Sequence, residues 1–340
     1  MLDIFNDDAF GIADMTDAVN LIPNQWGRIG AMGLFRDRPI RTTMFQVEQK
    51  NGVLQIIQSS ERGSRVPGAR IGKRDLRPFS THRFALTSNI TADDVQNLRA
   101  FGSATELVQV MDIVAERQVD LRSSIDITRE YLRAGALQGQ VKDADGTVLT
   151  NLFTEFGITQ KVVDFVFGTG TTDLGAKVEE VTDHIRLNML GDTMTSVHAL
   201  CSPTFWTKLM GHADFRERYK YFENTRGADP QRADVSGGFE WKGVVWEKYL
   251  ANGPVPQEDG SVVNQSFIPE GDARFFPVGT QQTFRQYNAP ADYIETVNTP
   301  GLPFYSMVDV KKRTVEVEVQ TQTIPLCVRP GTLVRGHSST

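Results

Sequence analysis

The chain has 340 residues, of which 40% are hydrophobic and 23% are charged, and its formal net charge is −6 at pH 7. These values are typical of globular proteins and exclude a wholly disordered chain. No run approaches 18 consecutive apolar residues, and the first ten residues hold three aspartates and no basic residue. We therefore expect neither a transmembrane helix nor an ordinary secretory signal, and no membrane partner.

The first 44 residues show little regular periodicity, and prolines and glycines interrupt them. Leu21, Ile22, Trp26 and Phe35 nevertheless make this segment too apolar to be left in water. We interpret it as an arm that needs a surface to lie on, and that surface can belong to another chain.

A basic segment overlaps this arm. Residues 26–83 contain 12 Lys or Arg and 4 Asp or Glu, a net charge of +8. Because the whole chain has a net charge of −6, the remaining residues together carry −14. Such a segment can bind nucleic acid, or it can lie on an acidic neighbour of the same kind. Few aromatic residues are interleaved with these charges, which favours contact with a neighbour over a nucleic-acid stacking surface.

Residues 43–58 form two β-rich runs around Asn51-Gly52, the strongest short hairpin signal in the chain. Residues 59–78 follow as a polar loop, rich in Arg and Gly, that cannot bury a core of its own. Either this loop is disordered at the surface or it becomes ordered against a neighbouring subunit. Residues 80–90 are predicted to be the strand that returns from the loop.

A short helix is predicted from Thr91, and a much longer one follows it. Ser103 and Glu106 fit a capping box, and apolar residues then recur at steps of three, four and seven until Gly139 ends the run. The sequence therefore predicts a helix over residues 104–138, about 50 Å long at 1.5 Å per residue. A globular helix averages about 11–12 residues, so this one suggests the backbone of an elongated domain.

The rest of the chain mixes strands and helices, which gives an α+β protein. One helix is predicted to end at Leu190, with this side chain pointing inward. A second helix is predicted to start at Ser202-Pro203, with Ser202 as N-cap and Pro203 as the first helical residue, and could continue to Phe222. The predicted strands are residues 146–156, 162–167, 235–250, 262–278 and 305–326, and the predicted helices are 177–190 and 202–222.

The sequence contains no complete motif for phosphate binding, metal binding or catalysis. Gly168, Gly170 and Lys177 do not have the spacing of a phosphate-binding loop, and the start of a calcium loop at Asp143 has no Glu at its twelfth position. The histidines lack metal-type spacing, and Cys201 and Cys327 are distant cysteines in apolar surroundings, typical of buried thiols in a reducing cytoplasm. We therefore expect no enzyme, no cofactor and no metal.

The order of these parts resembles the major capsid proteins of tailed bacteriophages, in the family related to the phage lambda head protein. The resemblance covers nearly the whole chain. Four stretches carry it: the basic loop 43–85 leading into the capped helix 103–138, Phe239–Tyr249, Phe267–Pro277, and Pro325–Val334.

The resemblance implies the HK97-like capsid fold, with an N-arm, an E-loop, a P-domain with a long spine helix, and an A-domain. The implied boundaries are 1–44 for the N-arm, 45–85 for the E-loop, 86–165 for the P-domain with spine helix 104–138, 166–302 for the A-domain, and 303–340 for strands that complete both domains.

The implied function is a structural head protein that self-assembles into hexamers and pentamers of an icosahedral shell around double-stranded DNA. The resemblance implies partners in further copies of the chain, a separate scaffolding protein, a portal and a possible decoration protein, with only weak DNA contact. The virion would be assembled in the host cytoplasm, and a cross-link through Lys73 is not expected. The residues expected at the assembly interface are Trp26, Phe35, Arg62, Arg65, Arg70, Lys73 and Arg74.

Two other functions stay open from the sequence. One is an encapsulin-like nanocompartment shell protein, which would have the same fold and package an enzyme. The other is a nucleic-acid-binding protein that uses the basic segment 26–83.

Overall fold

The structure is a computed structural model that describes residues 11–22, 27–50, 74–91, 94, 106–216, 238–256, 261–311 and 314–339. The chain forms two compact units, each built from three separate segments. Unit 1 comprises Met1–Phe45, Phe79–Arg133 and Arg285–Leu326, and unit 2 comprises Gln46–Pro78, Ala134–Phe284 and Cys327–Thr340.

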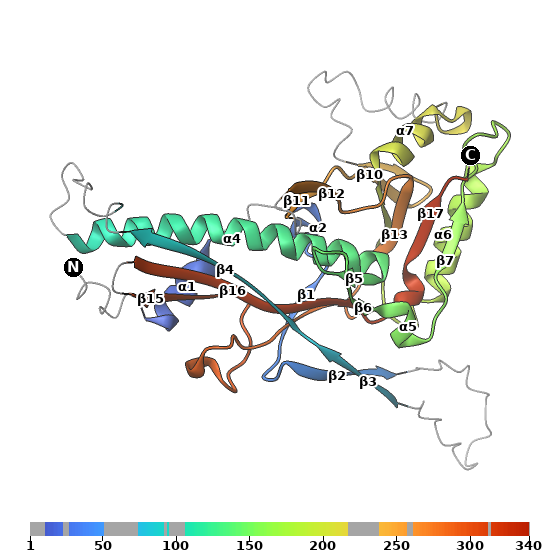
Figure 1. Cartoon of the computed structure of the whole chain (residues 1–340). Coiled ribbons are helices and arrows are strands. Elements are labelled where there is room, and N and C mark those ends of the chain that lie inside the picture. Colours follow the sequence, from blue (N-terminus) through green and yellow to red (C-terminus); the bar gives the residue numbers. More distant parts are fainter. Residues whose placement is uncertain are drawn as a thin grey trace, which may run out of the picture. The chain divides into compact units, whose positions relative to one another are not determined.

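Unit 1 combines a five-stranded sheet with three helices (Figure 1). Its strands follow the order β1-β14-β16-β15, and β4 pairs with the first ten residues of β16. The strands are β1 (Arg36–Pro39), β4 (His82–Thr91), β14 (Phe284–Asn288), β15 (Tyr305–Val310) and β16 (Thr314–Cys327), and the helices are α1 (Ile12–Leu21), α2 (Arg28–Ala31) and α4 (Glu106–Gln138).

The long helix predicted over residues 104–138 is confirmed as α4, which runs beside β4 and β16 in Figure 1. Its apolar positions Val114, Leu121 and Ile125 pack with Val317 and other residues of the sheet and of α1 in one core. Gly135 does not break the helix. A Cβ at this position would lie 2.8 Å from the carbonyl oxygen of Gln140, so glycine allows the following strand to approach closely.

The strand predicted over residues 305–326 is in fact two antiparallel strands, β15 and β16. The first half of β16 alternates, with Val315, Val317 and Val319 buried and the residues between them half-buried. Its second half is buried on both faces. This change explains why alternation in the sequence marks only the first part of the strand.

Unit 2 is built on a six-stranded sheet in the order β7-β17-β13-β8-β10-β9. Its core is strongly aromatic and includes side chains from α6 and α7. The elements are β7 (Lys161–Asp164), β8 (Ser196–Cys201), β9 (Phe239–Trp241), β10 (Val244–Lys248), β13 (Asp272–Val278), β17 (Val334–His337), α6 (Leu174–Leu187) and α7 (Pro203–Gly211).

Smaller elements complete the described chain. Three two-stranded sheets pair β2 with β3, β5 with β6, and β11 with β12. The remaining elements are β2 (Met44–Lys50), β3 (Arg74–Ser80), β5 (Gln140–Lys142), β6 (Val148–Asn151), α5 (Leu152–Phe156), β11 (Asn252–Pro256), β12 (Val262–Ser266), and the 3₁₀ helices η5 (Ile294–Thr296) and η6 (Pro330–Thr332).

The predictions for one strand and one loop need correction. The strand predicted to end at residue 156 stops at Asn151, because the Asn151 side chain accepts hydrogen bonds from the amides of Phe153 and Thr154 and starts α5. The loop predicted over residues 59–78 already becomes strand β3 at Arg74, and β3 pairs with β2; the Asn51-Gly52 turn lies outside the described residues.

The helix predictions in unit 2 also change. α6 ends at Leu187, so Leu190 lies beyond it, exposed and with a positive φ of 48°, instead of pointing inward. The predicted cap at Ser202 is confirmed, since its hydroxyl accepts from the amide of Phe205 at 3.4 Å. That helix, α7, ends at Gly211, and the residues predicted to extend it to Phe222 lie partly outside the described chain.

Candidate assembly interface

The N-terminal segment of unit 1 lies on α4 and is held there by polar side chains. Nε2 of Gln118 donates to the carbonyl oxygen of Met15 at 3.3 Å, and the guanidinium of Arg122 donates to the carbonyl oxygen of Val19. Met15 and Val19 also belong to the core. The predicted arm therefore finds a surface on its own chain around α1, and its contact with a neighbouring chain stays a prediction.

Glu130 of α4 fixes the second part of the arm. Its side chain is fully buried, and its two carboxylate oxygens accept from the amides of Ile29 at 2.6 Å and Gly30 at 2.9 Å. Gly27 immediately precedes α2 with a φ of 108°, and a Cβ there would lie 2.4 Å from Oε2 of Glu130. Only glycine suits both this conformation and this approach.

Charged side chains continue through the interior of unit 1. Arg122 pairs with Asp126 at 3.2 Å, and Arg129 donates to the carbonyl oxygen of Pro303 at 2.9 Å and lies 3.8 Å from Asp37. Burial lowers the pKa of Arg129 to about 9 and raises the pKa of Asp126. Because water reaches these buried groups poorly, each charge is compensated mainly by the opposite charges and hydrogen-bond partners beside it.

Sequence reasoning missed this charged layer, because charges on a long helix usually face solvent. One signal could have found it. Arg122 and Asp126 each directly follow a buried apolar residue of the helix and are four residues apart, so they share the inward side and can pair. The guanidinium carbons of Arg122 and Arg129 lie 3.5 and 4.5 Å from the ring centre of Phe304, which adds cation–π contacts.

Two of the residues predicted at the assembly interface, Phe35 and Arg74, lie in the described part of the chain. Phe35 is buried within unit 1, so its side chain packs in its own chain. Arg74 begins β3, but its side chain belongs to the part left undescribed. The others, Trp26, Arg62, Arg65, Arg70 and Lys73, lie outside the described residues. Their role in assembly stays a prediction.

The outer face of α4 carries an acidic ridge, defined by Asp112, Glu116 and Asp120. All three side chains are exposed and follow one another at a spacing of four residues, which places them on one side of the helix. Within the described ranges none of them forms an ion pair. The ridge offers three carboxylates to a basic partner.

Exposed apolar side chains lie on unit 2. Leu187 is 82% exposed at the end of α6, and Leu190 follows in the turn after it. Val262 and Val263 are also exposed, on the hairpin of β11 and β12. Single exposed apolar side chains are common on protein surfaces, so these four residues alone do not define an interface.

Asp192 holds the turn after α6 in place. Its carboxylate accepts from the amides of Gln281 and Gln282 and from the hydroxyl of Thr283, and it pairs with Arg329 at 2.7 Å. Burial alone would raise its pKa, but the hydrogen bonds outweigh burial and lower the pKa. The turn is therefore fixed before any partner binds.

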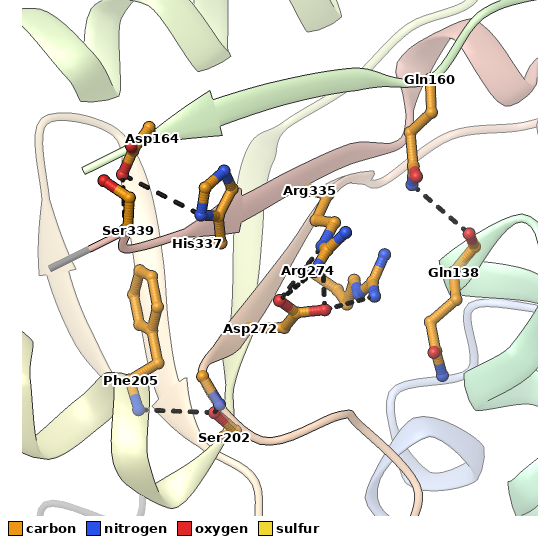
Figure 2. Close-up of polar contacts among 11 residues, drawn as sticks. Gln138, Gln160, Asp164, Ser202, Phe205, Asp272, Arg274, Arg335, His337 and Ser339 are labelled. Atoms are coloured by element: carbon orange, nitrogen blue, oxygen red, sulfur yellow. Dashed lines mark hydrogen bonds and ion pairs between the residues drawn. The ribbon is translucent and has the colours of Figure 1, made fainter. Parts of the chain in front are cut away.

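Further hydrogen bonds fix the edges of the sheet of unit 2, as Figure 2 shows. The hydroxyl of Ser202 accepts from the amide of Phe205 (Figure 2). It also accepts from the amide of Gly271 at 3.0 Å, so it joins the start of α7 to the loop before β13. Asp164 accepts from the amide of Ser339 at 3.0 Å and lies 4.0 Å from Nδ1 of His337.

The motifs examined for chemistry have structural roles. Asp173 caps α6 through the amide of Ala176, where a phosphate-binding loop would offer amides to a ligand. Asp145 accepts from the amide and hydroxyl of Thr147 and closes a turn. Both cysteines are buried and free. Within the described ranges no cluster suited to a metal is found, and no helix is long and apolar enough to cross a membrane.

Comparison with solved structures shows the fold. A protein described as a capsid protein of prophage, from E. coli CFT073, matches with a TM-score of 0.58 at 12% identity, over 95% of this chain and 97% of that one. The capsid protein of cyanophage P-SCSP1u matches with a TM-score of 0.50 at 12% identity, over 90% and 86%. The chain therefore has the predicted HK97-type capsid fold, of the α+β class.

Sequence comparison shows the family. Residues 11–338 match the model of the family "Phage major capsid protein E", and the chain belongs to this family. The major capsid protein of Pseudomonas phage KPP10 is 30% identical over 349 residues, which cover 97% of each chain. That of Salmonella phage Felix O1 is 28% identical over 96% of this chain and 95% of the relative. The predicted resemblance to phage major capsid proteins is confirmed.

Membership of this family identifies the function. The chain is a major capsid protein of a phage, a structural virion protein whose copies assemble into a shell. This assignment is better supported than the encapsulin-like alternative.

Proposed function

We propose that the chain builds an icosahedral phage head as hexamers and pentamers around double-stranded DNA, and that the basic loop of one copy binds the acidic ridge of another. The observation that carries the second part is charge complementarity. The loop contributes Arg62, Arg65 and Arg70 from a segment that has too few apolar residues for a core of its own. The ridge offers three exposed carboxylates on a rigid helix.

The energetics suit a shell. Each exposed ion pair is worth about 0.2–1 kcal/mol, so one loop adds little to the stability of a single contact. Summed over many copies in a closed assembly, such contacts select the register and the partner, while buried apolar area supplies most of the affinity.

In this function the chain is divided into an N-arm, an E-loop, a P-domain and an A-domain, with the boundaries given above. It has no catalytic activity. Its partners are a separate scaffolding protein, a portal and a possible decoration protein, with weak contact to packaged DNA. Assembly would take place in the host cytoplasm before the virion is released.

Negative-stain electron microscopy of the purified protein tests this function. Hollow particles, or capsomers of five and six copies, are expected. Replacement of Arg62, Arg65 and Arg70 by Glu should leave the subunit folded by circular dichroism but block assembly. Reversal of Lys177, Lys208 and Lys311, which lie elsewhere in the sequence, is the matched control and should leave particles intact. A protein that stays monomeric under all assembly conditions contradicts the shell function, and normal particles from the loop variant contradict the role of the loop.

A further inference from the structure

Two arginines share one buried aspartate in unit 2 (Figure 2). Asp272 opens β13, and its Oδ2 accepts from Nη2 of Arg274 at 2.6 Å. Nε of Arg335, on β17, lies 3.1 and 3.0 Å from the two oxygens of Asp272, and Nη2 of Arg335 lies 2.9 Å from Oδ1. Arg274 and Arg335 are direct neighbours in the antiparallel register of the two strands.

The charges of this cluster do not balance. Two guanidiniums meet one carboxylate, and the side chains of Asp272 and Arg274 are only 3% and 7% exposed. Burial and the charge of Arg335 together lower the pKa of Arg274 to about 10, although Asp272 opposes the shift. Asp272 therefore compensates the two cations only in part.

Hydrogen bonding is incomplete as well. Nε of Arg274 is buried and has no hydrogen-bond acceptor in the part of the chain that the structure describes. Both oxygens of Asp272 already accept from the two arginines. Among the described residues, no second carboxylate pairs with Arg274 or Arg335. The cluster therefore keeps the desolvation cost of one unpaired donor in addition to its excess positive charge.

Access comes from Arg335. Its side chain is 41% exposed, although its guanidinium also touches the buried carboxylate. A planar guanidinium has five N–H donors, and Asp272 occupies only those on Nε and Nη2 of Arg335. The outer edge of Arg335 can therefore bind a second group without giving up the first.

We propose that Arg274 and Arg335 form the preformed half of a binding site for an anionic oxygen group of the carboxylate or phosphate class. The group binds the outer edge of Arg335 in the forked geometry that guanidinium favours, and its charge compensates the excess on Arg274. Two sources supply this chemistry: free inorganic phosphate, or an Asp or Glu side chain of a second copy of the chain. Only the second source depends on the proposed shell function.

A phosphate titration of the unassembled full-length protein tests the site. Thermal unfolding is followed in inorganic phosphate, with sodium chloride keeping the ionic strength constant. The midpoint temperature is expected to rise by several degrees in saturating phosphate, because the anion binds the folded state only. Arg335→Gln should abolish this rise. The matched control Arg186→Gln removes a 65% exposed arginine on α6 and should retain it.

The same titration on assembled particles separates the two sources. Phosphate stabilisation that disappears on assembly, together with weaker assembly of Arg335→Gln, assigns the site to a carboxylate of another copy. Stabilisation that persists in particles assigns it to a free anion.

Two results overturn the site: no rise beyond that in chloride, or an equal rise in Arg335→Gln. If Arg335→Gln does not fold, Arg335→Lys keeps the charge and loses the fork, so it should show a smaller rise, and an unchanged rise would equally overturn the site. Because the titration of free subunits needs no assembly, its failure leaves the shell function untouched.

Discussion

The two units differ in what fills their interiors. In unit 2 aromatic rings meet one another: Phe165 stacks on Phe275 at 5.8 Å, and Trp246 meets Phe275 edge-on at 5.2 Å. In unit 1 the inner side of α4 carries Arg122 and Glu130 beside its apolar residues. The aromatic core of unit 2 is apolar, whereas the layer beneath α4 in unit 1 contains charges that need partners.

The two interiors therefore contribute differently to the stability of the fold and to the positioning of its segments. Close-packed aromatic rings contribute burial and dispersion energy that depends little on direction or pH. Buried charges contribute little net stability, but a missing partner is costly, so they fix which segment lies where. The charged layer of unit 1 therefore specifies the position of the N-terminal segment, and the aromatic core of unit 2 supplies stability.

The largest effect is expected from the aromatic core. Trp246→Ala removes a fully buried ring that also contacts Phe165 and Phe215, and should cost about 4 kcal/mol of unfolding free energy in chemical denaturation. Trp246→Phe is the control. It should cost much less, because it keeps a ring and removes an indole N–H that has no acceptor among the described residues. Equal costs for the two variants would contradict an apolar, close-packed core.

The charged layer should respond nearly as strongly, but locally. Glu130→Ala leaves the amides of Ile29 and Gly30 without their acceptor and should cost about 3 kcal/mol. Hydrogen exchange should accelerate most at those two amides. Glu116→Ala, on the exposed face of the same helix, should change stability by less than about 0.5 kcal/mol. Unchanged exchange at α2 in Glu130→Ala would show that the N-terminal segment is held by other contacts.

Asp192 should give a smaller effect that depends on pH. Its pKa is lowered in the folded state, so its stabilisation is fully present above the unfolded pKa of about 3.9 and is lost as the pH falls through the folded pKa. Asp192→Asn should cost about 2 kcal/mol at pH 7 and less at pH 3. Denaturation at both pH values measures this, and a cost independent of pH would contradict the assignment.

Leu190 should give the smallest effect, with the opposite sign. An exposed leucine at a φ of 48° is strained, so Leu190→Gly should raise the unfolding free energy of the free subunit by about 1 kcal/mol. The mirror control Leu187→Gly, at the helical end of α6, should lower it. Destabilisation by Leu190→Gly would show that the leucine packs within its own chain.

The sequence predicted those parts of the fold that local patterns determine. α4 has a long run without Pro or Gly and a clear apolar periodicity, and Ser202-Pro203 has a cap and a first helical residue, so both helices were found. The parallel pairing of β10 with β8 joins residues more than forty positions apart and leaves no local pattern. Leu190 was misplaced because apolar spacing continues past Leu187, where the helix ends.

The candidate site was predicted less completely than the fold. The excess of basic residues in the loop is a property of composition and can be counted, but the acidic ridge requires knowing which face of α4 is exposed. The cluster of Asp272, Arg274 and Arg335 depends on the pairing of β13 with β17, two strands about sixty residues apart. Only the structure brings these charges together.

A charge swap tests whether the basic loop of one copy binds the acidic ridge of another. Arg62, Arg65 and Arg70 are replaced by Glu in one variant, Asp112, Glu116 and Asp120 by Lys in a second, and all six in a third. Particles are counted by electron microscopy at equal concentrations of folded protein. Either single set is expected to block assembly, and the combined variant is expected to restore particles. Failure of the combined variant to assemble, or normal particles from either single set, would contradict it.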